Sequence, residues 1–255
     1  MDTPFGTDRW REGIFMKGKI GKNFRTNGYY FPVDIMPESH AESTGQRMSS
    51  QLADQRLSDP APHPRDPHLI SRLAYDLAVN TAILDVVEQL IGPDILVWAS
   101  GLFAKEPFTG RAIPWHRDVE DASGREGYVT AWIALSAATR ENGCMQFLSG
   151  SHLSTTGQEY AVPASGTEQG GDNGYASRFI EATVVPVELR PGQVSFHHGG
   201  LLHASHANFS AVPRIALAVT YVTPDNQVAY ALRDSAVLVR GRDEYGRFHP
   251  PVPAN

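Results

Sequence analysis

The stretch FHHGGLLHASHANFSAVPRIALAVTYV, residues 196–222, decides the fold class of this chain. It ends in RIALAVTYV, 214–222, a run of β-branched, aromatic and other apolar residues that follows turn-forming Ser, Asn and Pro. Such short runs between turn residues are typical of β-strands. Five runs between residues 95 and 198 have the same character: ILVWAS (95–100), YVTAWIALS (128–136), CMQFL (144–148), TVVPVEL (183–189) and QVSFHH (193–198).

Several short strands after a helical preface predict a mainly β fold with flanking helices. We expect a double-stranded β-helix, that is, a cupin-like jelly-roll barrel of two antiparallel sheets. A parallel α/β sheet fits poorly, because few helical segments separate the strands.

The helical preface is clearest in LISRLAYDLAVNTAILDVVEQLI, residues 69–91. Asn80 or Thr81 can cap a second helix within it, and Gly92 followed by Pro93 ends that helix. Apolar residues at helical spacing indicate a core-facing stripe: Ile83, Val86, Val87, Leu90 and Ile91.

The length of 255 residues fits one domain. We expect that domain to comprise a helical part over about 1–93, a jelly-roll core over about 94–225 and a tail over 226–255.

The composition excludes several functional classes. The formal net charge is −6 and the sequence pI is about 5.9, and no dense Lys/Arg run is present, so nucleic acid is not expected as a partner. The first residues lack the apolar core of a secretory signal, and no segment reaches the roughly 18 apolar residues of a membrane span. We therefore expect a cytoplasmic protein with no membrane partner. The oligomeric state is not indicated.

The metal-binding chemistry available to the chain is limited by its cysteine content. The single cysteine, Cys144, excludes an internal disulfide and any cysteine-rich zinc site. His, Asp and Glu remain as metal ligands.

His116 and Asp118 lie two residues apart in PWHRDVED, 114–121. In extended chain, positions i and i+2 face the same side, so an imidazole and a carboxylate at this spacing can bind one ion together. The same triplet also fits a solvated turn. Two ligands hold a metal poorly, so a metal site here needs a third ligand from elsewhere.

The third ligand is sought among four histidines of residues 196–222. A strand ending at His203, followed by Ser205 and by Arg214 at the start of the next strand, would place an imidazole and a guanidinium on facing strands. Two His and one carboxylate on one face of an octahedral ion leave three positions open, which is the arrangement of non-haem Fe(II) oxygenases. Arg214 would supply a planar fork that suits a carboxylate. The four candidates are His197, His198, His203 and His206.

These residues resemble the phytanoyl-CoA dioxygenase family of Fe(II)- and 2-oxoglutarate-dependent oxygenases. The family pattern has H-x-D, a W-x-A-L strand, an NG turn before a G-S-H segment, and H-x-S-x-x-N-x-S followed by an arginine. The resemblance extends from NGYYFPV (27–33) to SAVLVRGRDEYGRF (235–248). The matching segments are WHRD (115–118), AWIAL (131–135), ENGCMQFLSGSH (141–152) and HASHANFS (203–210), with Arg214 eleven residues after His203.

The resemblance implies that His116, Asp118 and His203 bind Fe(II). It also implies that 2-oxoglutarate and O2 are consumed, with release of succinate and CO2. Relatives that install halogen replace the carboxylate with a small residue. Asp118 therefore implies hydroxylation, or desaturation or ring closure, rather than halogenation.

The resemblance also assigns a cosubstrate site. Arg214 would hold the distal carboxylate of 2-oxoglutarate, and Ser205 would donate a hydrogen bond to it. Trp132 would line that side of the pocket. Lys105, in FAKEP, matches a position that reaches the cosubstrate in some relatives.

The remaining histidines and tryptophans have other expected roles. His197 and His198 lack an arginine at the matching interval, so a core-edge or substrate-facing role is expected. His206 fits a turn that bonds to backbone, and His152 fits a role in orienting a loop over the site. Trp98 and Trp115 lie near the pocket, and packing is the expected role for Trp98.

For two segments, the sequence allows two roles each. Glu120 and Asp121 would either select a basic or amine-bearing substrate or form a solvated turn. Residues 154–180 are polar and Gly-rich, and they form either a lid or a surface insertion.

The function expected from these observations is oxidation of a small molecule, a polar metabolite or a natural-product intermediate. One alternative keeps the fold without O2 chemistry, as a cupin-like metal-dependent isomerase or hydrolase. Another is a non-catalytic relative that only binds a small molecule. Arg214 argues against the first, since a metal hydrolase needs no carboxylate clamp, and the complete ligand set argues against the second.

Overall fold

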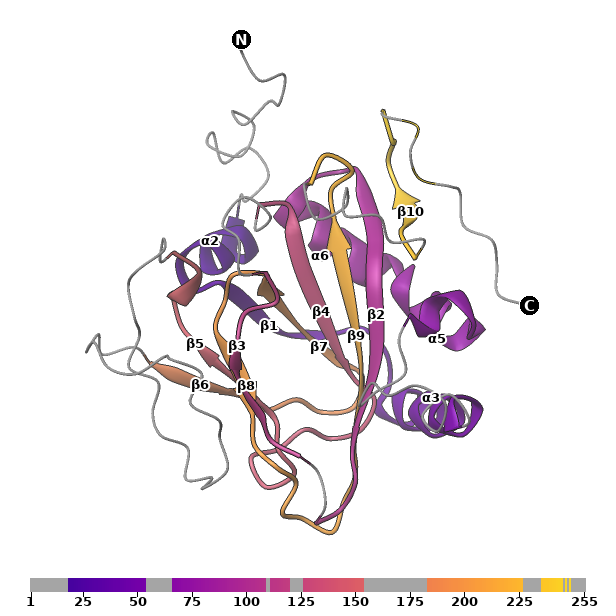
Figure 1. Cartoon of the computed structure of the whole chain (residues 1–255), viewed down its shortest axis with the longest axis vertical. Helices are drawn as coiled ribbons and strands as arrows, with labels where there is room; N and C mark the ends of the chain where they lie inside the picture. The colour runs from indigo at the N-terminus through magenta and orange to yellow at the C-terminus, as the bar shows by residue number, and fades with distance from the viewer. Residues whose placement is uncertain are drawn as a thin grey trace.

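The computed structural model describes residues 18–53, 66–108, 111–119, 126–153, 183–226, 235–244, 246 and 248 (Figure 1). Its helices are α2 (Gly18–Asn27), α3 (Glu38–Gln51), α5 (Arg72–Ala78) and α6 (Thr81–Ile91), with 3-10 turns η1 (Pro67–Leu69) and η3 (Ser151–Leu153). Its strands are β1 (Tyr29–Asp34), β2 (Ile95–Lys105), β3 (Ile113–His116), β4 (Tyr128–Ala134), β5 (Met145–Leu148), β6 (Val184–Val187), β7 (Gln193–His198), β8 (His203–Ser205), β9 (Arg214–Val222) and β10 (Val237–Arg240).

The strands form two antiparallel sheets. The larger has the order β1-β7-β4-β9-β2-β10 and the smaller the order β3-β8-β5-β6. The mainly β fold with flanking helices is thereby confirmed. The predicted closure into a barrel is not observed, because the edge strands β3 and β6 pair with no described strand of the larger sheet. The two sheets form an open sandwich (Figure 1).

The larger sheet separates two apolar layers, because alternate residues of its strands face opposite sides. On β4, Val129, Ala131 and Ile133 belong to the core that includes the helices. Trp132 and Ala134 belong instead to the core that includes Met145 and Phe147 of the smaller sheet, among others. The helices therefore cover one face of the larger sheet, and the other face points between the sheets.

The predicted helix over the second half of residues 69–91 is present as α6. The side chain of Asn80 accepts hydrogen bonds from the backbone N–H groups of Ala82 and Ile83, at 2.9 and 3.4 Å, and so caps the helix. Gly92, with φ of 98°, ends it in a conformation that favours glycine. The predicted stripe is buried: Ile83, Val86, Val87, Leu90 and Ile91.

Some strands were not predicted, and proline accounts for two of them. β1 contains Pro32 and β3 contains Pro114, and a proline lowers the strand signal of a short run. β10 pairs with β2, so the predicted tail adds a strand to the larger sheet. The strand expected to end at His203 instead begins there, as β8. Within the described residues, no helix has the length and apolar character needed to cross a bilayer.

Candidate iron and 2-oxoglutarate site

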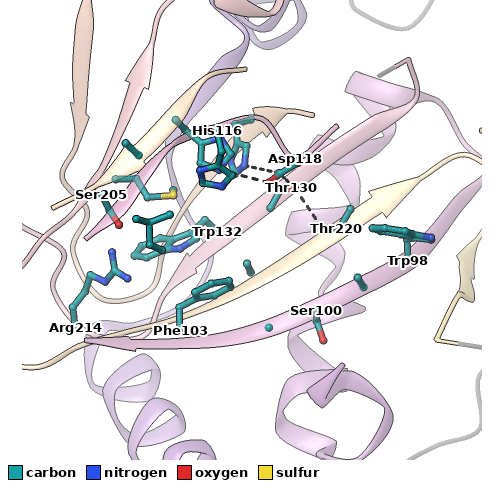
Figure 2. Close-up of a pocket in the computed structure, with 18 residues that line it drawn as sticks. Trp98, Ser100, Phe103, His116, Asp118, Thr130, Trp132, Ser205, Arg214 and Thr220 are labelled. Atoms are coloured by element: carbon teal, nitrogen blue, oxygen red, sulfur yellow. Dashed lines mark hydrogen bonds and ion pairs between the residues drawn. The ribbon is translucent and has the colours of Figure 1, made fainter. Parts of the chain in front are cut away.

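The structure brings His116, Asp118 and His203 together. Figure 2 shows His116 and Asp118 close to each other at the wall of a cavity. His116 ends β3 and is paired with His203 at the start of β8 in the β3–β8 ladder. Asp118 lies two residues past the end of β3, in a bend. One potential ligand atom from each residue lies within 4.8 Å of those of the other two. The three side chains can therefore share one ion.

Backbone carbonyls fix the orientation of both imidazoles. The Nδ1 of His116 donates to the carbonyl oxygen of Pro114 at 2.8 Å, and the Nδ1 of His203 donates to that of Leu201 at 3.0 Å. A carbonyl only accepts, so each Nδ1 is the donor, and in the neutral imidazole Nε2 keeps its lone pair. This is how metal-binding histidines are usually held. The donor set of two imidazoles and one carboxylate fits Fe(II).

The protonation states also suit a metal. The Asp118 side chain is 21% exposed. Burial opposes its ionisation, but the neighbouring His203 and a hydrogen bond from His197 outweigh burial and hold the pKa of the carboxyl well below its usual range. Burial lowers the pKa of His203 to about 3. At neutral pH the site offers a carboxylate and a neutral imidazole, the forms that bind metal.

Arg214 lies at one end of the site, at the start of β9, and is 2% exposed. Its Nη1 donates to the carbonyl oxygen of Gly143 at 2.6 Å, while its Nε has no partner among the described residues. The guanidinium lies 5.2 Å from the centre of the Trp132 ring. Burial lowers the pKa of Arg214 to about 10, so it remains a cation at neutral pH. No carboxylate of the described residues pairs with it, so this buried cation fits an incoming carboxylate.

Ser205 and Lys105 lie beside Arg214. Ser205 lines the cavity, and its Oγ accepts a hydrogen bond from Lys105 Nζ at 2.9 Å. Lys105 also bonds to the carbonyl oxygens of Ser205 and His206, and it pairs with Arg214 in the β2–β9 ladder. Burial, and then the charge of Arg214, lower the pKa of Lys105 to about 7. Lys105 does not line the cavity and contacts it through Ser205.

A cavity of about 380 Å³ contains the site. Figure 2 shows Arg214 at one end and Trp98 at the other, with His116 and Asp118 between them. Gly101 and Ala218, which face each other across β2 and β9, leave the space open because they have almost no side chain. Trp98 packs near Tyr128, with ring centres 6.1 Å apart, and it also lines the cavity, so its role exceeds the packing expected from the sequence.

The other histidines divide by location. His197 lines the cavity, and its Nε2 lies 3.1 Å from Asp118 Oδ2. His198 accepts a hydrogen bond from the backbone of Gly200 within its own turn, and His152 bonds to the carbonyl oxygen of Arg25. These last two hold loops and do not line the cavity.

Nothing in the sequence indicated that Thr130 contacts Asp118, nor that His197 does. The Oγ1 of Thr130 donates to Asp118 Oδ2 at 3.0 Å. The period-two pattern of YVTAWIALS could have placed Thr130 on the same face as Trp132, but no sequence signal placed Asp118 above it. Glu120, Asp121 and the candidate lid, residues 154–180, lie outside the described residues.

Comparison with known proteins identifies the class. The structure resembles that of the non-haem monooxygenase ThoJ, with a TM-score of 0.73 and 32% identity over 92% of this chain and 88% of that one. Another structure of ThoJ is a nickel complex. A further fold match is to CytC3 with Fe(II) and α-ketoglutarate, with a TM-score of 0.64 and 23% identity over 94% of this chain and 95% of that one.

The sequence identifies the family. The Phytanoyl-CoA dioxygenase (PhyH) family matches residues 26–216, and the chain belongs to that family. A curated relative, the ectoine dioxygenase of Sphingopyxis alaskensis, is 23% identical over 257 aligned residues, which cover 88% of this chain and 82% of that protein. The protein is an Fe(II)- and 2-oxoglutarate-dependent oxygenase that uses O2, as the sequence predicted. The alternative of a metal hydrolase or isomerase is set aside.

Proposed function

We propose that His116, Asp118 and His203 are the iron ligands, and that Arg214 binds the distal carboxylate of 2-oxoglutarate. The observation that carries the second assignment is the buried Arg214 guanidinium, whose Nε has no partner among the described residues. Leaving such a donor unpaired in the interior is costly, and a carboxylate at this place would satisfy it. Ser205 lies on the same side, with its hydroxyl proton free to point at that carboxylate because Lys105 donates to its oxygen.

Each residue then has a defined part in the reaction. Iron, 2-oxoglutarate and O2 together supply the oxidising power, with release of succinate and CO2. Arg214 and Ser205 orient the cosubstrate, and Trp132 packs against the guanidinium and limits its movement. Lys105 holds Ser205 in place from behind. The apolar walls of the cavity exclude water from the reacting atoms.

The substrate we propose is a small polar metabolite or natural-product intermediate, which is hydroxylated, desaturated or cyclised. The cavity of about 380 Å³ has room for a small molecule beside the cosubstrate. The ectoine dioxygenase similarity supports a small polar substrate. Asp118 fills the carboxylate position, which supports oxygen insertion over halogenation. Mass spectrometry of cell metabolites should reveal a compound that gains one oxygen or loses two hydrogens when the enzyme is added.

We also propose that the whole chain works as one domain in the cytoplasm, without a nucleic-acid or membrane partner. The net charge of −6 supports the exclusion of nucleic acid. Fractionation of cells that express the tagged chain tests the location.

The ligand assignment is tested by anaerobic addition of Fe(II) and 2-oxoglutarate to the protein. We expect a weak visible charge-transfer band that is lost in His116→Ala and in Asp118→Ala. His206→Ala is the matched control, because this histidine lies near the site without lining the cavity, and it should keep the band. A band of full strength in both ligand variants would refute the assignment.

A further inference from the structure

Three polar residues form a row across the face of the larger sheet that looks into the cavity. His197 of β7 is paired with Thr130 of β4, and Thr130 is paired with Thr220 of β9. All three line the cavity and are nearly buried. The wall beside this row includes small side chains such as Ala99 and Ala218, so the row places three polar side chains next to one another.

This row meets one particular oxygen of Asp118. His197 Nε2 lies 3.1 Å and Thr130 Oγ1 lies 3.0 Å from Asp118 Oδ2. The other carboxylate oxygen, Oδ1, faces His203 Nε2 at 3.6 Å. The two oxygens of the carboxylate therefore have different surroundings: Oδ2 is bonded to the larger sheet, and Oδ1 faces His203.

The hydrogen bonds of this row all run toward Asp118. A carboxylate only accepts, so His197 Nε2 and Thr130 Oγ1 must carry the protons in these bonds. Thr130 has a single hydroxyl proton, so in its contact with Thr220, at 3.3 Å, the Thr220 hydroxyl is the donor. His197 Nδ1 is buried and has no partner among the described residues. Asp118 is therefore the one described hydrogen-bond partner of this imidazole.

We propose that His197 and Thr130 are positioning residues that hold Asp118 by Oδ2, so that the carboxylate offers the metal only Oδ1. The inference rests on the ligand assignment proposed above. A carboxylate bound through both oxygens would occupy one more coordination position of an octahedral ion. Holding one oxygen back keeps three positions for 2-oxoglutarate and O2. Partners of this kind orient metal ligands and raise metal affinity.

This role differs from the two roles that the sequence allowed for His197. A core-edge histidine needs no polar contact, whereas His197 is 2% exposed and makes a hydrogen bond to a carboxylate. A substrate-facing histidine would direct a free polar atom into the cavity, whereas Nε2 of His197 is bonded to Asp118 and Nδ1 is buried. His197 is also outside the group of side chains whose donor atoms can share an ion.

The test measures Co(II) affinity in the metal-free protein, without 2-oxoglutarate, O2 or substrate. His197→Phe keeps a ring of similar size and removes the hydrogen bond. His197→Gln loses the ring and keeps an N–H that can reach Oδ2. We expect His197→Phe to bind Co(II) about 10- to 100-fold more weakly and His197→Gln to recover most of the loss.

Thr130 gives an independent pair with less risk to folding. Thr130→Val keeps the shape and loses the hydroxyl, so we expect roughly tenfold weaker Co(II) binding. Thr130→Ser keeps the hydroxyl and should bind as the wild type does. Ser195→Ala is the control, because Ser195 is the neighbouring inward residue of β7 and has no hydrogen-bond partner among the described residues.

The outcomes separate a failure of the ligand assignment from a failure of the positioning role. If Asp118→Ala binds Co(II) as tightly as the wild type, the ligand assignment itself is wrong. If Asp118→Ala loses Co(II) while His197→Phe and Thr130→Val keep it, only the positioning role is wrong. If His197→Phe binds better than His197→Gln, packing rather than the hydrogen bond explains His197, and the inference is overturned.

Discussion

The two ends of the cavity are built in different ways. At the Arg214 end, hydrogen bonds hold one short segment together: Asn208 Nδ2 donates to the carbonyl oxygen of Val212, and Ser210 bonds to Asn208 Oδ1. Asn208 Nδ2 also donates to the carbonyl oxygen of Lys105, which ties this segment to β2. At the Trp98 end, the walls come from distant elements. There the carbonyl oxygen of Trp98 accepts a hydrogen bond from Ser235, a residue 137 positions away.

The difference fits the two ligands. The same cosubstrate must bind in every turnover, so a rigid, polar end with a buried cation suits it. At the Trp98 end, where we propose that the substrate binds, the cavity has an aromatic wall and no charged side chain among the described residues apart from the iron site itself. Changes at the Arg214 end should therefore alter 2-oxoglutarate binding, and changes at the Trp98 end should alter substrate binding alone.

The largest effect is expected from Arg214→Gln. This change removes the buried charge that faces the cosubstrate carboxylate and leaves a neutral amide of smaller reach. Loss of a buried, hydrogen-bonded charge partner costs about 3 kcal/mol, or roughly 150-fold in the Kd for 2-oxoglutarate. The measurement is a titration of the Fe(II) protein with 2-oxoglutarate, followed by the charge-transfer band under anaerobic conditions.

The control for this variant is its Co(II) affinity without cosubstrate, which should stay at the wild-type value because Arg214 does not bind the metal. A thermal melt establishes that the variant folds. A Kd for 2-oxoglutarate within threefold of the wild type, in a folded variant, would contradict the proposed role of Arg214.

A smaller effect is expected from pH. Without cosubstrate, Lys105 loses its proton as pH rises through about 7. A carboxylate bound beside it favours the charged amine, so binding above pH 7 takes up a proton. The Kd for 2-oxoglutarate should therefore rise with pH above about 7, by at most about tenfold per pH unit. Below pH 7 the amine is already charged, so this dependence should flatten.

Lys105→Met isolates this contribution. The variant removes the titrating group but keeps an unbranched side chain of similar length, so the Kd should no longer follow pH in that range. Calorimetry in two buffers of different ionisation enthalpy would count the protons taken up directly. Equal pH dependence in the wild type and the variant would exclude Lys105 as the source.

The contrast between the two ends of the cavity also explains which site residues could be predicted from the sequence. His203, Ser205, Asn208 and Arg214 lie within one turn and the starts of two strands, so their spacing fixes their geometry and the motif is readable. Asp118 could be paired with His116 by spacing alone. The contact of Asp118 with Thr130 and His197 depends on strand register in the folded sheet, which no local pattern encodes.

The two wrong expectations, barrel closure and a packing role for Trp98, also concern features that depend on the folded structure rather than on local sequence. Whether two sheets close into a barrel depends on the pairing of their edge strands, a property of long-range contacts rather than of strand composition. Trp98 was expected to be packing because a tryptophan in a strand is usually buried. The bulge in β2 between Val97 and Ala99 instead leaves Trp98 at the cavity wall, and a bulge of this type has no clear signature in ILVWAS.

The smallest effect is expected from Trp98→Leu, and it tests the comparison most directly. Leucine replaces the indole with a smaller apolar group, so part of the apolar contact with the substrate is lost. A loss of about 1 kcal/mol corresponds to roughly a fivefold rise in KM for the substrate. The Kd for 2-oxoglutarate should not change, because Trp98 lies at the opposite end of the cavity from Arg214 (Figure 2). Both constants can be measured on one preparation: the KM from succinate formation at varied substrate, and the Kd from the anaerobic charge-transfer titration with 2-oxoglutarate. If the two constants change by the same factor, the ends are not independent, and the division of the cavity into a cosubstrate end and a substrate end fails.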